Sequence, residues 1–130
     1  MHHFPRSLPL LLGYAALVMA WQIVGIARIA AGGRALGPSA SLVTAAIALA
    51  VAGLLWWTRN RRVPFLGLAA LAGAAALQAI SNAFRADPSL WPSDLARYLG
   101  VAINGLGVCA VLVAVVEGLF PRSGPAPPAE

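Results

Sequence analysis

The chain has 130 residues and is strongly apolar: hydrophobic residues make up 60% of it, charged residues only 10%, and its mean hydropathy is +0.80. This composition excludes an ordinary soluble domain, which cannot bury so much apolar surface. The net charge of +5 comes from arginine without any lysine. No basic patch with interleaved aromatic residues indicates nucleic-acid binding, so the arginines are expected at membrane headgroups instead.

Four apolar stretches are each long enough to cross a bilayer, which takes about 20 residues for a core of roughly 30 Å. They cover residues 8–29, 38–57, 64–84 and 95–120. None alternates between polar and apolar residues, and helices satisfy the backbone hydrogen bonds in lipid. The sequence therefore predicts an all-α integral membrane protein, a four-transmembrane-helix antiparallel bundle with short loops.

The chain is expected to form one membrane domain over residues 1–120 and a Pro-rich disordered tail over residues 121–130. Pro38 suits the first position of the second helix. Asp94 suits the start of the fourth helix, where a negative charge is favourable. The first stretch resembles a signal peptide as far as Ala20, but its apolar run continues to Ile29, which favours an uncleaved span.

Arginine placement predicts the orientation. With four spans both termini share one side, which holds Arg6, Arg59, Arg61, Arg62 and Arg122. The opposite side holds Arg28, Arg34, Arg85 and Arg97. Clustering in the turn around Arg61 favours a bacterial-type inner (plasma) membrane with cytoplasmic N- and C-termini, although the near balance leaves dual insertion open. The tryptophans Trp56, Trp57 and Trp91 fit the two interfacial aromatic belts.

Polar side chains inside the spans collect in the outer half of the membrane. Gln22, Thr44, Gln78 and Asn104 lie at nearly one level, about 4 to 6 Å outward of the midplane by helical rise. On the third helix Gln78, Ser81, Asn82 and Arg85 share one face, which continues the small residues Ala70 and Ala74. An amide facing lipid leaves donors unmet, so these faces should turn inward or toward a partner.

Two interpretations of this polar layer stay open. The side chains join neighbouring helices by hydrogen bonds, or they line an arginine-rimmed pocket open to the outer leaflet. Such a pocket would hold a quinone, a lipid headgroup, another anion or a partner helix. The candidate pocket or partner-binding residues are Gln22, Arg28, Thr44, Gln78, Ser81, Asn82, Arg85, Arg97 and Asn104.

The remaining reactive side chains offer little chemistry. His2 and His3 precede the first span, so no intramembrane haem or metal site is expected from histidine, and no cofactor is predicted. Cys109 is the single cysteine and is expected to pack in the fourth helix. Glu117, the one carboxylate inside a span, is expected near the cytoplasmic boundary, paired with Arg59, Arg61 or Arg62 or reaching the interface.

By elimination the sequence favours a protein that is not an enzyme: a non-catalytic accessory or assembly subunit of a larger membrane complex. Its partners would be membrane lipids and other membrane subunits, or further copies of itself. One alternative is a small oligomeric transporter or channel. Another is a lipid- or quinone-binding membrane protein that uses the polar pocket in the outer leaflet.

Overall fold

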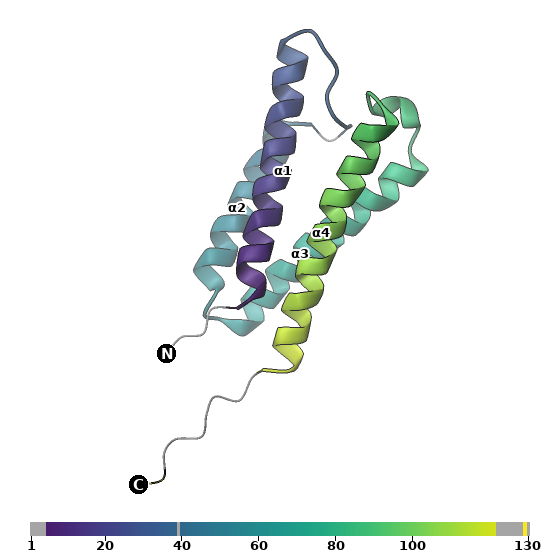
Figure 1. Cartoon of the computed structure of the whole chain (residues 1–130). Coiled ribbons are helices and arrows are strands. Elements are labelled where there is room, and N and C mark those ends of the chain that lie inside the picture. Colours follow the sequence, from purple (N-terminus) through teal and green to yellow (C-terminus); the bar gives the residue numbers. More distant parts are fainter. Residues whose placement is uncertain (1–4, 39, 122–128, 130) are drawn as a thin grey trace.

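The computed structural model describes residues 5–38, 40–121 and 129, and these form four α-helices (Figure 1). The helices are α1 (Ser7–Ala30), α2 (Leu42–Thr58), α3 (Arg62–Arg85) and α4 (Asp94–Leu119), with a short 3₁₀ turn η1 (Pro88–Leu90) before α4. Successive helices run in opposite directions, so α1 begins and α4 ends at the same end of the molecule. The predicted all-α, four-helix antiparallel bundle is confirmed.

Three of the helices in the described part of the chain, α1, α3 and α4, are long and apolar enough to cross a membrane. The fourth, α2, has 17 residues and reaches only about 26 Å at the usual rise. The predicted start of this helix at Pro38 is wrong. Ser41 is in extended conformation and its Oγ accepts a hydrogen bond from the backbone N–H of Thr44 at 3.0 Å, so α2 begins after this cap, at Leu42.

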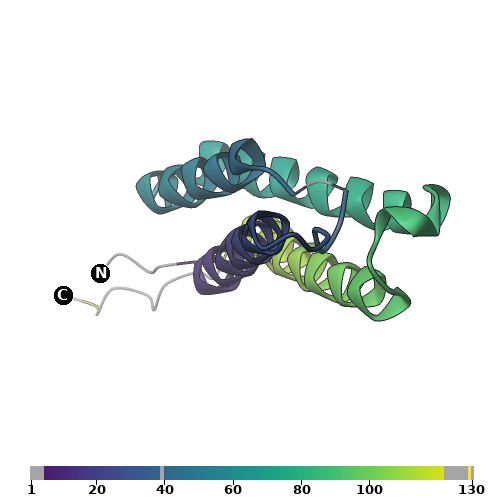
Figure 2. The ribbon, with the colours of Figure 1, turned by 90° about the horizontal axis from the view of Figure 1, so that it is seen from above.

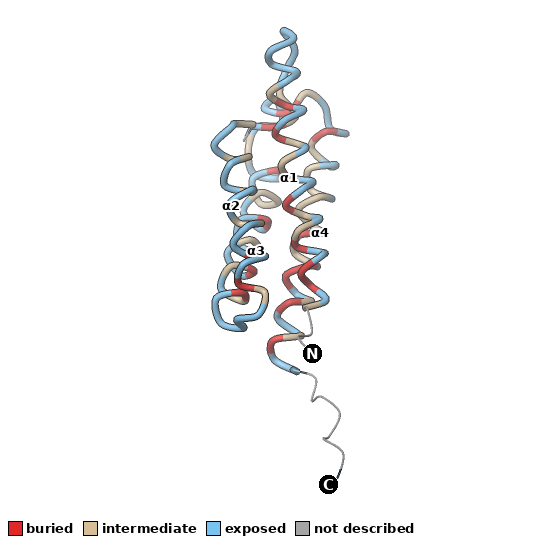
Figure 3. Tube along the Cα trace, turned by 90° about the vertical axis from the view of Figure 1, so that its left-hand side faces the viewer, coloured by how far each residue is buried: buried red, intermediate tan, exposed pale blue. Residues whose placement is uncertain are grey.

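Large apolar side chains are exposed on every helix, among them Ile23 on α1, Leu49 on α2, Leu71 on α3 and Leu112 on α4. Buried positions recur along α1, α3 and α4 with exposed positions between them, whereas on α2 only Leu55 and Thr58, near its end, are buried (Figure 3). A soluble monomer rarely exposes so much contiguous apolar surface. These features are those of a multi-pass membrane protein.

The helices form a ring in which α1 packs on α2 and α4, and α4 packs on α3, whereas α2 and α3 contact each other only lightly. Seen from above, α1 and α4 form one row and α2 and α3 the other (Figure 2). The apolar core lies toward the end of the bundle where α1 begins. It consists of Leu8, Leu11, Leu55, Phe65, Ala69, Ala110, Val111 and Ala114.

The α1 terminus shows why the chain turns there. Gly32 has φ +82°, a left-handed conformation that glycine adopts without strain. Its N–H donates to the carbonyl of Ile29 at 3.0 Å, and the N–H of Gly33 donates to the carbonyl of Arg28 at 2.8 Å. This Schellman arrangement satisfies the carbonyls of Arg28 and Ile29 and turns the chain back toward the bundle after α1.

Glu117 on α4 caps the start of α1. Its carboxylate accepts the backbone N–H groups of Arg6 at 2.8 Å and Ser7 at 3.2 Å, and the Ser7 hydroxyl at 2.8 Å. The predicted pairing of Glu117 with the arginines of the α2–α3 turn is wrong, because the unsatisfied N–H groups of α1 lie within its reach. Arg62 instead donates through Nη2 to the carbonyl of Gly118.

The structure also bears on several predictions about single residues. Trp56 and Trp57 are exposed, as interfacial residues should be, but Trp91 is only 8% exposed and turns into the bundle. Cys109 is exposed on α4, so its predicted packing role is wrong. His2, His3, Arg122 and the tail beyond Pro121, except Ala129, lie outside the described residues.

Candidate functional site

A cavity of about 350 Å³ lies among the four helices, at the end where the two longer connections meet. Residues from all four helices and from both connections line it. Six of the nine candidate residues are among them: Gln22, Thr44, Gln78, Asn82, Arg97 and Asn104. Three aromatic residues that the sequence had not connected with this layer, Tyr14, Trp21 and Trp91, also line it.

The space exists because small residues surround it. Ala75, Ala79 and Ala83 from α3 and Gly100 from α4 contribute to the wall. The opposite end of the bundle is filled by large side chains of the apolar core. In addition α2 begins late and contributes a single lining residue, Thr44. The small residues of α3 and α4 and the late start of α2 therefore leave, at this end, a volume typical of the smaller ligand pockets.

The deep end of the cavity is a Tyr14–Asn104 pair. The Tyr14 hydroxyl donates to Oδ1 of Asn104 at 2.6 Å, and Nδ2 of Asn104 donates to the carbonyl of Gly100 at 2.8 Å. The Tyr14 ring occupies the space that a side chain at Gly107 would need, since a Cβ there would lie 2.5 Å from Tyr14 Cζ. Glycine at position 107 therefore permits the close approach of this ring.

Gln22 is buried, with 3% of its surface exposed, and its Oε1 accepts the backbone N–H of Ser41 at 3.2 Å. The Ser41 hydroxyl contacts the Thr44 hydroxyl at 2.8 Å. Gln22 lies about two turns, or about 12 Å of rise, along α1 from Tyr14, the partner of Asn104. The amides of Gln22 and Asn104 line one cavity but stabilise different parts of it.

The polar face of α3 is placed differently from the expectation. Gln78 and Asn82 line the cavity but are exposed, and Nε2 of Gln78 donates to Oδ1 of Asn82 at 3.0 Å. The buried face of α3 is formed instead by Phe65, Ala69, Gly73, Ala76 and Ala83. The polar face of α3 therefore does not turn wholly inward, and its other predicted orientation, toward a partner, stays a prediction. The exposed amides indicate that the cavity opens on the α3 side.

Three candidate residues do not line the cavity: Arg28, Ser81 and Arg85. Arg28 is exposed and its Nε donates to the carbonyl of Arg34 at 2.9 Å, which keeps it at the end of α1. Arg85 is exposed at the end of α3. The arginine rim predicted from three helices is thus reduced to one arginine, Arg97.

The two connections meet above the cavity. Arg34 donates through Nη2 to the carbonyl of Ser89 and so links them directly. A Cβ at Gly37 would lie 3.2 Å from Nε1 of Trp91 and 3.8 Å from Nε1 of Trp21, so the backbone of Gly37 packs close to both indoles. The packing of the two connections against each other explains why Trp91 faces inward. Sequence position alone places Trp91 at an interface without indicating which way its ring turns.

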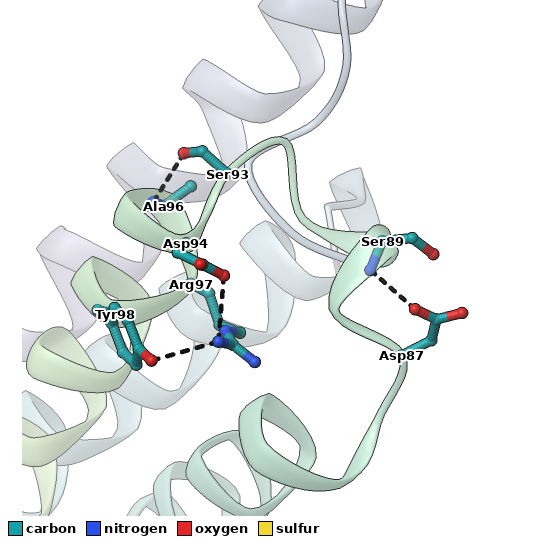
Figure 4. A network of polar contacts seen from close by, with 7 residues as sticks. All are labelled: Asp87, Ser89, Ser93, Asp94, Ala96, Arg97 and Tyr98. Carbon is teal, nitrogen blue, oxygen red and sulfur yellow. Dashed lines mark hydrogen bonds and ion pairs between the residues drawn. The ribbon is translucent and has the colours of Figure 1, made fainter.

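Arg97 lies on α4 between two partners from its own helix (Figure 4). Its Nη2 donates to Oδ1 of Asp94 at 3.1 Å and to the Tyr98 hydroxyl at 3.3 Å. Nearby, the backbone N–H of Ser89 donates to Oδ1 of Asp87 at 2.9 Å (Figure 4). The hydrogen bonds that the exposed Asp87 carboxyl makes with Ser89 hold the pKa of this carboxyl below its usual range.

The cavity is lined by amide, hydroxyl and guanidinium groups beside apolar and aromatic side chains. Within the described residues, no group of three or more histidine, cysteine, aspartate or glutamate side chains is placed to hold a metal ion. Comparison of the chain with models of known families, with curated proteins and with solved structures finds no match.

Proposed function

We propose that this protein is a non-catalytic multi-pass membrane protein that binds an amphipathic molecule, a lipid or a quinone, in the cavity between its helices. The observation that carries the proposal is the cavity itself. Its volume of about 350 Å³ suits a headgroup or a single ring, and it is lined by residues of both polar and apolar character.

The shape of the site supports a ligand that is only partly enclosed. Tyr14, Trp21 and Trp91 offer rings against which an apolar or planar group packs, and Asn104 offers a polar contact. A long acyl or isoprenoid chain exceeds the enclosed volume, so it has to leave the bundle. The side between α2 and α3 is the least tightly packed, and the α3 amides Gln78 and Asn82, which line the cavity, are exposed.

A substitution that fills the cavity tests this function. Ala79 lines the cavity, so Ala79→Phe should remove most of the space for a ligand and cause a several-fold loss of any copurifying lipid or quinone. Purification in a mild detergent, followed by mass spectrometry of the extracted small molecules, measures this loss. Ala70→Phe, on the exposed face of α3, is the matched control and should retain the ligand.

Equal amounts of bound small molecules in the two variants and the unmodified protein would contradict the proposal. Loss of the helical circular dichroism signal in Ala79→Phe would indicate unfolding, and the same comparison is then made with Ile103→Phe, which acts from α4. Retention of the ligand in a folded cavity-filling variant would show that the molecule binds elsewhere.

The second candidate function is the accessory or assembly subunit. It is favoured by one observation: Gln78 and Asn82 are exposed on α3, although an amide facing lipid is unfavourable. A neighbouring subunit that covers this part of α3 would supply partners for the amides. The same purification distinguishes the candidates, because a stable larger assembly supports a subunit role, and a homo-oligomer without a bound ligand supports the small transporter or channel.

We also propose that α2 is a fourth span and that both termini lie in the cytoplasm of a bacterial-type inner membrane. With 17 residues α2 is a few Å shorter than the hydrocarbon core, a mismatch that local thinning of the bilayer accommodates at modest cost. The arginines of the turn after α2, Arg59 and Arg61, and the exposed Trp57 support a position of this end at the membrane interface.

Single cysteines test this topology in a Cys109→Ala background. Asn60→Cys lies in the arginine turn and Ser89→Cys in the α3–α4 connection, and both positions are exposed. In intact cells a membrane-impermeant thiol reagent should label Ser89→Cys and leave Asn60→Cys unlabelled. The opposite result would reverse the orientation, and labelling of both would indicate dual insertion.

A further inference from the structure

We propose that the ligand of the cavity carries an acidic group, a phosphate or a carboxylate, and that Arg97 binds it. This inference rests on the proposed function, since it specifies the class of amphiphile. Among the described residues that line the cavity, Arg97 is the only one with a formal charge. A charge in this position favours an anionic group over the neutral carbonyl of a quinone.

The guanidinium of Arg97 has donor capacity that the structure leaves unused. The side chain is only 14% exposed, yet within the described residues both of its hydrogen bonds come from Nη2. Its Nε is buried and has no hydrogen-bond partner. Nη1 likewise makes no hydrogen bond among the described residues. An oxyanion in the cavity that accepts from Nη1 would therefore use donor capacity that the protein leaves free.

Besides its contact with the Tyr98 ring, at 5.0 Å from Cζ to the ring centroid, Arg97 makes one ion pair. Asp94 is its partner at 3.1 Å, but the Asp94 side chain is 75% exposed. Solvent therefore screens the pair from the Asp94 side and reduces its contribution. A ligand phosphate inside the cavity would meet the guanidinium in a less polar environment, where arginine and phosphate form short, charge-assisted hydrogen bonds.

The position of Arg97 along the bundle suits a lipid-like acid. It lies in the first turn of α4, at the end of the cavity where the two connections meet and Trp91 packs. An acidic headgroup bound there would remain near the level of the membrane headgroups, and its chain would extend past Asn82 toward the open side of the cavity. The chain would then enter the bilayer with its ordinary orientation.

The intrinsic tryptophans provide a binding assay. Trp21 and Trp91 line the cavity, whereas Trp56 and Trp57 lie in the last turn of α2 and are exposed. In a Trp56→Phe, Trp57→Phe background the protein is placed in vesicles of zwitterionic lipid. It is then titrated with an alkyl phosphate that carries bromine close to its headgroup, and separately with the neutral alcohol of the same chain. Bromine quenches indole fluorescence, and specific binding saturates.

The phosphate compound should bind at least tenfold more tightly than the alcohol. Arg97→Gln should weaken its binding by about 10- to 100-fold, the range expected for a charged hydrogen bond, and leave binding of the alcohol unchanged. Asp94→Asn should act in the opposite direction, with binding up to about fivefold tighter, because a competing carboxylate is removed. Arg85→Gln, which changes an arginine outside the cavity, is the matched control and should have no effect.

The outcomes separate the two proposals. Saturable quenching by both compounds with equal affinity, unchanged by Arg97→Gln, would overturn the acidic ligand and leave amphiphile binding in place. Quenching that never saturates with either compound would overturn the proposed function itself. If inorganic phosphate displaces the alkyl phosphate at similar concentrations, the site takes a free anion and the lipid-like ligand is wrong. If Arg97→Gln fails to fold, the opposite shift expected for Asp94→Asn still decides the role of Arg97.

Discussion

Replacement of Glu117 by alanine should destabilise the bundle by about 2–3 kcal/mol, one of the largest effects expected for a single substitution in this chain. The Glu117 carboxylate accepts three hydrogen bonds at the start of α1, from the N–H groups of Arg6 and Ser7 and from the Ser7 hydroxyl. Ser7 is fully buried, so its donors would lose their acceptor without gaining water. A lower midpoint of thermal unfolding measures the effect.

Two further variants distinguish a cap from a general packing effect. Glu117→Gln keeps a side-chain oxygen but loses the charge that favours a helix N-terminus, so it should cost about half as much. Ser7→Ala combined with Glu117→Ala should be less than additive, because both changes remove the same 2.8 Å bond. Full additivity, or a Glu117→Ala variant as stable as the original protein, would show that the carboxylate does not hold α1 to α4.

The sequence predicted the fold well because length and apolar character determine it. A span has to be long enough to cross the bilayer, and α1, α3 and α4 therefore begin and end within a few residues of the predicted limits. The start of α2 was missed because two turn signals compete there. Pro38 is suited to a first helical position, but the Ser41 side chain satisfies the backbone N–H of Thr44 and sets the beginning of the helix.

The rotation of α3 could not be predicted from the same pattern. Ala69 and Gly73 form one row of small residues and Ala70 and Ala74 form another, one residue apart. The structure buries the first row, with Gly73 close against Val111, and leaves the second row exposed. A helical pattern shows which residues share a face, but the shape of the neighbouring helix decides which of two similar faces is buried.

Only part of the candidate site could be predicted, because the sequence does not give the position of one helix along its neighbour. Counting residues from the middle of each span selected Gln22, Thr44, Gln78 and Asn104, which do line one cavity. The same count assigned Tyr14 to the other half of the membrane. Its pairing with Asn104 depends on how far α1 is shifted along α4, and packing sets this shift. Gly107 is the one sequence signal of this contact, because a large ring needs a residue without a side chain opposite it.

Introduction of a single methyl group at this contact should disturb the deep end of the cavity. A Cβ at Gly107 would lie 2.5 to 2.7 Å from three ring atoms of Tyr14, closer than real Cβ contacts. Gly107→Ala should therefore displace the ring and break its hydrogen bond to Asn104. We expect a loss of about 2–4 kcal/mol from overpacking together with the lost hydrogen bond. Thermal unfolding in a fixed detergent measures it.

A neighbouring glycine supplies the control, and a second substitution supplies the decisive test. At Gly105 a Cβ would meet nothing within 4 Å, so Gly105→Ala should be neutral or stabilise α4 by up to about 1 kcal/mol. Tyr14→Ala removes the ring, so Gly107→Ala should cost almost nothing in that background, and the double-mutant cycle should show strong coupling. If Gly107→Ala were equally harmful with and without the Tyr14 ring, a clash with Tyr14 would not be the cause of the loss, and the deep end of the cavity would not be the Tyr14–Asn104 pair.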